Sequence, residues 1–302
     1  MKNIILIGIV SLLIVISCGE NNINKPGQPP SIDSLSYGTD TTFDIMTWNI
    51  EWFPKNNLAT IDYVSQIIEN LDIDLIAIQE VSDTTLFKQM LEGIDGYEGY
   101  FKSSWFAGLA YIYKTDAIEI NDIYEIYTTS PYWNPFPRSP MVIELNFMNE
   151  NFIIINNHFK CCGDGILDPY DASDEETRRL EASNLLKQYI DSNFPNKRVI
   201  LLGDLNDILT DDPVNNVFQG FLEDPDNYLF ADMNIALGNS SNWSYPSWPS
   251  HLDHILVTNE LFDNILDVQT LRLQDSFDGG WNEYELYISD HIPVAMQLEF
   301  SK

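Results

Sequence analysis

The chain has 302 residues, with 15 Lys and Arg against 46 Asp and Glu, which gives a formal net charge of −31. Its composition, 44% hydrophobic and 20% charged, allows a packed core and excludes wholesale disorder. The excess of acid argues against a general polyanion binder, because phosphate binding relies on Lys and Arg. It leaves open an enzyme that handles phosphate through a bound metal ion.

The N-terminal segment is predicted to be an export signal. Lys2 precedes the apolar run 4–16, and small residues follow it, an order typical of a signal peptide. The run is shorter than the roughly 20 residues that a spanning helix needs. Val15-Ile16-Ser17-Cys18 resembles a bacterial lipoprotein cleavage site, which implies removal of residues 1–17 and lipidation of Cys18. An uncleaved signal anchor is the alternative, and both interpretations export the chain.

Three parts follow from this interpretation. Residues 1–17 would be the signal peptide, 18–42 a flexible tether and 43–302 one domain. The tether is rich in Pro, Gly, Asn and Ser, which disfavour regular structure, although an ordinary disordered terminus would look the same. We expect a monomeric lipoprotein of a bacterial cell envelope, at the outer membrane or cell surface, that contacts the membrane through its lipid anchor only.

From residue 43 onward, strand and helix patterns interleave. Helices are expected at 60–71, 83–94 and 174–191. Strands are expected at 43–50, 75–78, 107–113, 140–147, 152–157, 199–202, 255–257 and 293–300. Because no linker-like break interrupts this alternation, one α/β domain is favoured over two.

The segment 161–176 leaves two questions open. Cys161 and Cys162 remain once Cys18 is assigned to lipid, and they are either free thiols or a strained vicinal disulfide. The segment also carries six acidic residues. They are interpreted as a solvated loop that caps the following helix, with a structural Ca²⁺ site as the alternative.

Polar side chains lie at one end of six apolar strands. They are Asn49, Glu80, Asn157 with His158, Asp204 with Asn206, Asp253 with His254, and Asp290 with His291. Open sheets bind ligands at such strand ends, and burying these groups is costly unless they pair or bind a cation. The carboxylate and amide oxygens in this set suit Mg²⁺ or Mn²⁺, not zinc. Such an arrangement is usual for phosphoryl transfer.

These strand ends carry a family resemblance. The motifs are Thr47-Trp48-Asn49-Ile50-Glu51, Ile78-Gln79-Glu80-Val81, Asn156-Asn157-His158-Phe159-Lys160, Gly203-Asp204-Leu205-Asn206-Asp207, Leu252-Asp253-His254-Ile255-Leu256 and Ser289-Asp290-His291-Ile292-Pro293. In this order they resemble the endonuclease/exonuclease/phosphatase superfamily, whose members are deoxyribonuclease-I-like. The resemblance implies a four-layer α/β sandwich, with two face-to-face mixed β-sheets flanked by helices.

The resemblance also implies roles for residues at the metal and the water. Glu80 would be the principal metal ligand, with Asn49 and Asp290 beside it. His291 would be the general base toward the attacking water, or the group paired with the charged phosphate. Asp253 would orient His291, whose unperturbed pKa of about 6.5 suits work near neutral pH.

Further residues would act on the water and the phosphate. Asp204 would position the water or help to deprotonate it. Asn206 and His158 would hold phosphoryl oxygens as charge grows in the transition state. Arg138 matches a phosphate-contacting Arg of some relatives, with a surface ion pair as its alternative. Each of these residues has a structural alternative taken singly, but six structural coincidences at six strand ends are improbable.

Two remaining histidines and an aromatic loop complete the candidates. His254 adjoins Asp253, so strand alternation points it away and it is interpreted as structural, whereas His251 can face the site or solvent. Tyr245 and Trp248 lie in a loop that borders the substrate in relatives. They would stack on a base or sugar, or else pack on the sandwich.

Three functions are weighed. The first is an exported, divalent-metal-dependent nuclease, which cleaves phosphodiester bonds by water attack. The second is a phosphatase or phosphodiesterase acting on a nucleotide, inositol phosphate or sphingolipid, which the acidity accommodates more easily. The third is a surface binding protein on the same fold without turnover. The sequence favours the first, and it supports the reaction class better than the substrate.

Overall fold

The computed structural model describes residue 32 and residues 35–300. The predicted signal peptide, the lipidation at Cys18 and most of the predicted tether therefore lie outside the described residues. Within the described part of the chain, no helix is both long and apolar enough to cross a membrane.

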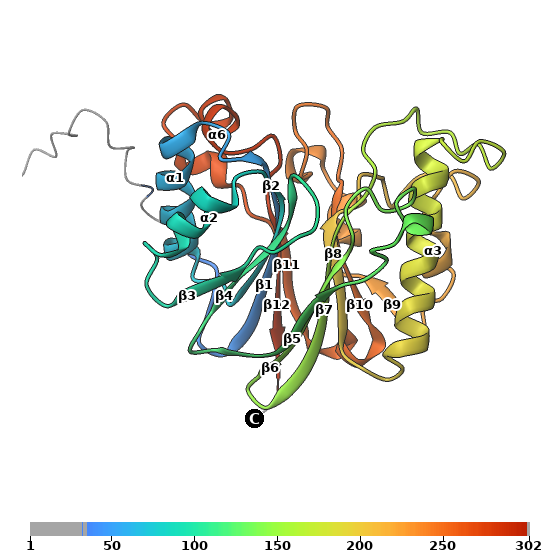
Figure 1. Cartoon of the computed structure of the whole chain (residues 1–302), viewed down its shortest axis with the longest axis horizontal. Coiled ribbons are helices and arrows are strands. Elements are labelled where there is room, and N and C mark those ends of the chain that lie inside the picture. The colour runs from blue at the N-terminus through green and yellow to red at the C-terminus, as the bar shows by residue number, and fades with distance from the viewer. Residues whose placement is uncertain (1–31, 33–34, 301–302) are drawn as a thin grey trace, which may run out of the picture. The chain divides into compact units, whose positions relative to one another are not determined.

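Two six-stranded sheets form the centre of the domain (Figure 1). The first sheet has the order β11 (Ile265–Thr270), β12 (Val294–Glu299), β1 (Thr42–Phe53), β2 (Leu75–Val81), β4 (Gly108–Lys114) and β3 (Tyr97–Tyr100). The second has the order β5 (Ile118–Glu125), β6 (Met141–Phe147), β7 (Glu150–His158), β8 (Val199–Asp204), β10 (Asp253–Thr258) and β9 (Tyr228–Phe230).

Each sheet contains one parallel pair among antiparallel neighbours. In the first sheet the pair is β1 and β2, with β12 antiparallel to β1. In the second it is β7 and β8, with β10 antiparallel to β8. The carboxyl ends of each parallel pair therefore share an edge with the amino end of the antiparallel neighbour. This is the reason that motifs at strand ends and strand starts can meet.

Helices cover the outer faces of both sheets. α1 (Asn57–Leu71), α2 (Thr84–Leu91) and α6 (Trp281–Tyr287) lie on the first sheet, and the long α3 (Glu175–Asn193) lies on the second (Figure 1). The short α4 (Gln219–Leu222) and α5 (Met233–Ala236) occur in connections. Three apolar clusters fill the spaces between these four layers. The predicted four-layer sandwich is confirmed.

Most predicted elements are present, with differences at the sheet edges. The helix predicted to reach residue 94 ends at Leu91, and Gly93 follows. The four edge strands were not predicted: β3 and β9, which have 4 and 3 residues, and β5 and β11. In β5 a register shift between Ile120 and Asp122 interrupts the two-residue alternation that would have identified it.

The domain begins earlier than predicted. The backbone N–H groups of Tyr37 and Gly38 donate to the Leu71 carbonyl at the end of α1, over 3.3 and 2.8 Å. Gln297 donates to the Tyr37 carbonyl over 2.8 Å, and the Tyr37 side chain is buried. The predicted boundary at residue 43 is therefore too late, because this apolar side chain and its backbone are fixed against the domain.

A polar bridge joins the two sheets inside the core. Gln79 of β2 donates to the Asn156 side chain of β7 over 2.8 Å. The Asn156 amide donates in turn to the carbonyls of Ile78 and Ala110 in the first sheet, over 2.9 and 3.0 Å. Both side chains are fully buried, so each depends on the other to satisfy its polar atoms. The bridge sets the two sheets in one relative position next to Glu80 and Asn157.

Removing this bridge is expected to destabilise the domain. Gln79→Met keeps the side-chain length but leaves the Asn156 oxygen buried without its donor, so the free energy of unfolding should fall by about 1–3 kcal/mol. Gln89→Met on the exposed face of α2 is the matched control and should change it by less than about 0.5 kcal/mol. Urea unfolding measures both. Equal effects of the two variants would contradict the role of the bridge.

Candidate active site

A cavity of about 660 Å³ opens at the edge where the strand ends of both sheets meet. Nine of the predicted site residues line it: Asn49, Glu80, His158, Asp204, Asn206, Tyr245, Trp248, Asp290 and His291. The predicted convergence of these side chains is therefore present in the structure, while their chemical roles stay predictions.

Asn49, at the end of β1, connects two carboxylates. Its Nδ2 donates to Glu80 Oε1 over 3.2 Å and to Asp204 Oδ2 over 2.9 Å. Its Oδ1 accepts the backbone N–H of Glu51 over 3.0 Å. Because its amide NH₂ rather than its oxygen faces the carboxylates, Asn49 holds Glu80 and Asp204 together in this structure.

His291 and Asp253 form the predicted pair. His291 Nδ1 lies 2.7 Å from Asp253 Oδ2, and its Nε2 lies 3.7 Å from Asp204 Oδ2 and 3.9 Å from Asp290 Oδ1. Burial lowers the pKa of His291, but the charges of Asp253 and Asp204 outweigh it and raise the pKa to about 10. The imidazole is therefore a cation at neutral pH.

His158, at the end of β7, behaves in the opposite way. Its Nε2 lies 3.4 Å from Asp204 Oδ2 and 3.8 Å from Glu80 Oε1. Burial, together with the positive charges of Arg138 and His291, holds its pKa well below the usual range. His158 is thus neutral and can donate a hydrogen bond through Nε2.

Asp204 lies at the centre of these contacts. Burial raises its pKa, the charge of His291 lowers it and that of Asp253 raises it, for a net value of about 7. Asp204 Oδ1 accepts the backbone N–H of Asn206 over 3.1 Å. A carboxylate with this pKa can exchange a proton near neutral pH.

Several residues that line the cavity have a strained backbone. Glu51, Glu80 and Asn206 have φ values of 35°, 68° and 53°, in the left-handed region that non-glycine residues rarely adopt. Gly203 has φ 143°, and a Cβ there would lie 2.0 Å from the Asn157 carbonyl oxygen, so only glycine fits. Strained residues of this kind persist where the surrounding structure holds them, typically at functional sites.

Glu51 is a site residue that the sequence analysis missed. Its Oε2 accepts the backbone N–H of Asp290 over 2.8 Å, and it forms an ion pair with Lys55. Burial raises the pKa of Glu51, Lys55 lowers it and the charge of Asp290 raises it. No periodic signal identifies it, because the register of β1 shifts between Asn49 and Phe53 and interrupts the two-residue alternation that would relate Glu51 to Asn49.

The three predicted substrate-binding residues differ in their placement. The Tyr245 ring lies 4.9 Å from the His291 ring, between centroids, and Trp248 is 78% exposed at the rim. Both line the cavity. Arg138 is not among the lining residues; its Nε donates to the Ala107 carbonyl over 3.2 Å, and its charge acts on His158 from outside the cavity.

In the acidic loop before α3, carboxylates accept hydrogen bonds from nearby backbone N–H groups. Asp174 accepts the backbone N–H of Thr177 over 2.7 Å and so caps α3, as the preferred interpretation predicts. Asp171 accepts both the N–H and the hydroxyl of Ser173. The alternative of a structural Ca²⁺ stays untested. Cys161 and Cys162 are free and exposed, and both line the cavity.

The sequence matches one known protein family. The family model described as the Endonuclease/Exonuclease/phosphatase family matches residues 46–291. The chain belongs to this family. Membership supports a phosphoester hydrolase. No curated protein matches the chain.

Several solved structures have the same fold as this chain, although their sequences are only 12–16% identical to it. TDP2 of D. rerio, complexed with a single-strand DNA product, is 12% identical with a TM-score of 0.65, covering 86% of this chain and 100% of that one. An endonuclease/exonuclease/phosphatase of Bacteroides vulgatus is 15% identical with a TM-score of 0.62, covering 86% of this chain and 100% of that one. A mannosyl-6-phosphatase of Bacteroides thetaiotaomicron is 16% identical with a TM-score of 0.58, covering 85% of this chain and 100% of that one.

The donor set fits the hard divalent ion that this family implies. Glu51, Glu80, Asp204 and Asp290 direct carboxylates toward one cavity, and the raised pKa values of Glu51 and Asp204 reflect burial and mutual repulsion. Oxygen donors crowded in this way are the ligands that Mg²⁺ and Mn²⁺ prefer. Glu80, Asp290 and Glu51 would hold the ion.

Metal should therefore stabilise the wild type much more than Glu80→Gln. Without metal, Glu80→Gln relieves repulsion and should melt at or above the wild-type temperature. With Mn²⁺ at one hundred times its Kd, the wild type should gain about 2.7 kcal/mol and the variant much less.

Glu92→Gln, which removes an exposed carboxylate after α2, is the matched control and should respond to Mn²⁺ as the wild type does. Thermal unfolding in EDTA and in Mn²⁺ measures all three proteins. An equal Mn²⁺ response of Glu80→Gln and the wild type would remove Glu80 from the proposed metal site.

Proposed function

We propose that the protein is a divalent-metal-dependent phosphoester hydrolase in which water attacks a phosphorus held at the cavity. The observation that carries this proposal is the convergence of four carboxylates, a cationic His291 and a neutral His158 on one cavity. When bound, Mg²⁺ or Mn²⁺ polarises a phosphoryl oxygen and offsets the charge that develops on it.

Of the two roles predicted for His291, the protonation state favours the second. A base must be unprotonated, and the pKa of about 10 leaves His291 protonated at neutral pH. Its Nε2–H would therefore pair with a phosphoryl oxygen. Asp253 fixes the ring through Nδ1 and stabilises the cation.

Asp204 and His158 would complete the reaction centre. Asp204, with a pKa of about 7, is suited to position the attacking water and accept its proton. His158 can donate from Nε2 to a second phosphoryl oxygen, and Asn206 can donate from its side-chain amide. His158 is buried and Asn206 Nδ2 also donates to the Phe159 carbonyl over 3.3 Å, so both donors are oriented toward the cavity by the protein itself.

For the substrate, the charge of the cavity favours a single phosphate on an uncharged remainder. Apart from histidines, Arg179 is the sole cationic residue among those lining the cavity, and it is 3% exposed. Its guanidinium is engaged by Asp207, Glu176 and two backbone carbonyls. A polynucleotide presents several phosphates, each of which needs a cation, and none is free here.

A nuclease, which the sequence favours, remains the second candidate. Trp248 and Trp52 expose 78% and 51% of their surfaces at the cavity, and aromatic rings stack on bases as readily as on sugars. The location that the sequence predicts, a lipid-anchored protein of the bacterial envelope, is proposed for either substrate class.

Catalysis should depend on the metal and on His291. EDTA should abolish turnover of a phosphomonoester, and His291→Ala should lower kcat by about 10²–10⁴-fold because a proton-bearing partner of the phosphate is lost. Asp171→Asn in the exposed acidic loop should leave kcat unchanged. Wild-type rates for both His291→Ala and Glu80→Ala would show that the site is assigned wrongly.

Substrate preference should follow the charge of the cavity. A sugar phosphate should have a higher kcat/KM than plasmid DNA, RNA or sphingomyelin. Trp248→Ala should raise KM about tenfold with little change in kcat, because stacking on the substrate is lost equally in the bound ground state and in the transition state. Trp133→Ala, an exposed Trp outside the cavity, is the control. Plasmid nicking with no phosphomonoester turnover would favour the nuclease.

A further inference from the structure

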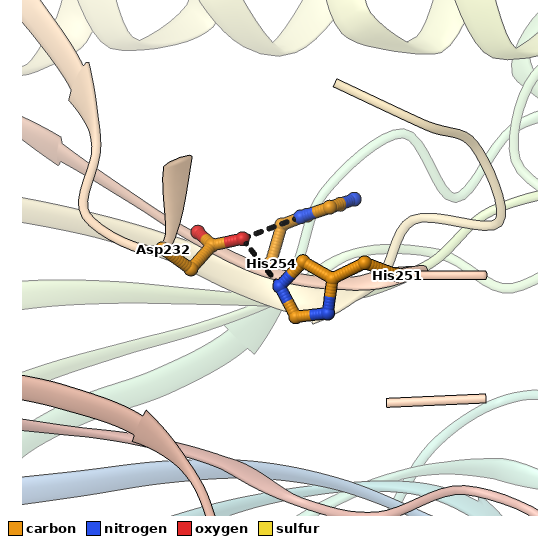
Figure 2. A group of neighbouring side chains, drawn as sticks. All are labelled: Asp232, His251 and His254. Carbon is orange, nitrogen blue, oxygen red and sulfur yellow. Dashed lines mark hydrogen bonds and ion pairs between the residues drawn. The ribbon is translucent and has the colours of Figure 1, made fainter. Parts of the chain in front are cut away.

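A second buried cluster lies behind the active site. Asp232 follows β9, His251 lies in the loop before β10, and His254 is the second residue of β10 (Figure 2). All three are at most 1% exposed. Strand alternation separates the two sites, because Asp253 points to His291 while its neighbour His254 points to Asp232.

Hydrogen bonding determines the protonation of His254. Its Nδ1 lies 2.6 Å from Asp232 Oδ2, and its Nε2 lies 2.9 Å from the Asp207 backbone carbonyl oxygen. A carboxylate and a carbonyl both accept only, so each ring nitrogen must carry a proton. His254 is therefore an imidazolium. Burial lowers its pKa, but the charge of Asp232 outweighs this and raises it.

The hydrogen-bond partners of His251 show in the same way that its ring is neutral. Its Nδ1 accepts the backbone N–H of Ser244 over 3.3 Å, so its proton lies on Nε2, which donates to Asp232 Oδ2 over 3.0 Å. The other oxygen of Asp232 accepts the N–H of Ile255 over 2.9 Å. Every polar side-chain atom of the three residues thus has a partner.

This pattern argues against a metal ion between the three side chains. A metal on His251 Nε2 would move the proton to Nδ1, where it would face the Ser244 N–H donor. The carboxylate oxygen shared by both rings is also at hydrogen-bond distance from each. A carboxylate between one neutral and one cationic imidazole is consistent with all the contacts.

The cluster holds the segment that carries Asp204 and Asn206. His254 binds the carbonyl of Asp207, and the Asp207 side chain accepts from Arg179 Nε over 2.7 Å. Arg179 Nη1 then donates to the carbonyls of Lys160 and Cys162, each over 2.7 Å. One wall of the cavity is thereby fixed to the imidazolium.

His251 is connected to the Asp253–His291 pair through Ser244, whose backbone N–H donates to His251 Nδ1. The Ser244 hydroxyl accepts the backbone N–H of Asp253 over 3.1 Å, and the Ser244 carbonyl accepts that of Ile292 over 2.7 Å. Ile292 follows His291 directly. A shift of His251 would therefore be transmitted to both members of the Asp253–His291 pair.

We propose that Asp232, His251 and His254 form a positioning network that sets Asp204, Asn206 and the Asp253–His291 pair in their reactive arrangement. The proposal rests on the proposed function, because positioning is defined by the reaction. Its protonation pattern is nevertheless independent of any activity.

NMR of the wild-type protein labelled with ¹⁵N-histidine tests that pattern directly. At pH 7, His254 should show protons on both ring nitrogens and His251 on Nε2 alone. Zn²⁺ added after blocking the thiols should leave both sets of signals unchanged. An unprotonated Nδ1 on His254 would refute the imidazolium, and a Zn²⁺-induced shift of both rings would identify a cation site. Either result would overturn the proposal.

Kinetics test the positioning role. Asp232→Asn and His254→Gln should lower kcat by about tenfold to a hundredfold, with KM within about twofold, because small displacements of reacting groups have effects of this size. Asp74→Asn, which alters a buried carboxylate at the opposite end of β2, is the control; it should reduce stability without changing kcat.

Wild-type kcat in both cluster variants would refute positioning, whatever their stability. If the wild type itself turns over no phosphoester, the proposed function fails, whereas the NMR result still decides the protonation pattern.

Discussion

The crowding of carboxylates around the active-site cavity is the constraint on which the arrangement of this site depends. Eight acidic residues line the cavity, Glu51, Glu80, Asp204 and Asp290 among them, and their burial or partial burial reduces the screening of their charges by water. Nearby cations are few: His291 compensates Asp253 and Asp204, Lys55 pairs with Glu51, and Arg179 pairs with Glu176 and Asp207. A bound ligand can offset such repulsion between carboxylates. A divalent ion together with an anionic substrate would do so here.

The fold supplies the rigidity that this arrangement requires. Each sheet directs one parallel strand pair and one antiparallel neighbour at the same edge, so that six backbone ends meet. The buried Gln79–Asn156 bridge fixes one sheet against the other. Behind the second sheet, the carboxylate of Asp232 holds two imidazoles. The reactive groups are thus held by buried polar contacts rather than by apolar packing alone.

Sequence reasoning located the strand ends but not every contact between them. Glu80, Asp204 and His291 were predicted to meet because each follows or precedes an apolar run that identifies its strand. Glu51 was missed because the register of β1 shifts between Asn49 and Phe53, which interrupts the alternation that would relate it to Asn49. Asp232 could not be assigned, because its partners come from a loop and a strand 19 and 22 residues away, and no local pattern encodes that contact.

Diffraction from crystals soaked in Mn²⁺, recorded at the manganese absorption edge, tests the central claim most directly. The account predicts one strong anomalous peak in the cavity, within bonding distance of carboxylate oxygens of Glu80 and Asp290. A cavity without such a peak, with manganese bound only at the acidic loop before α3 or between Asp232 and the two histidines, would contradict it.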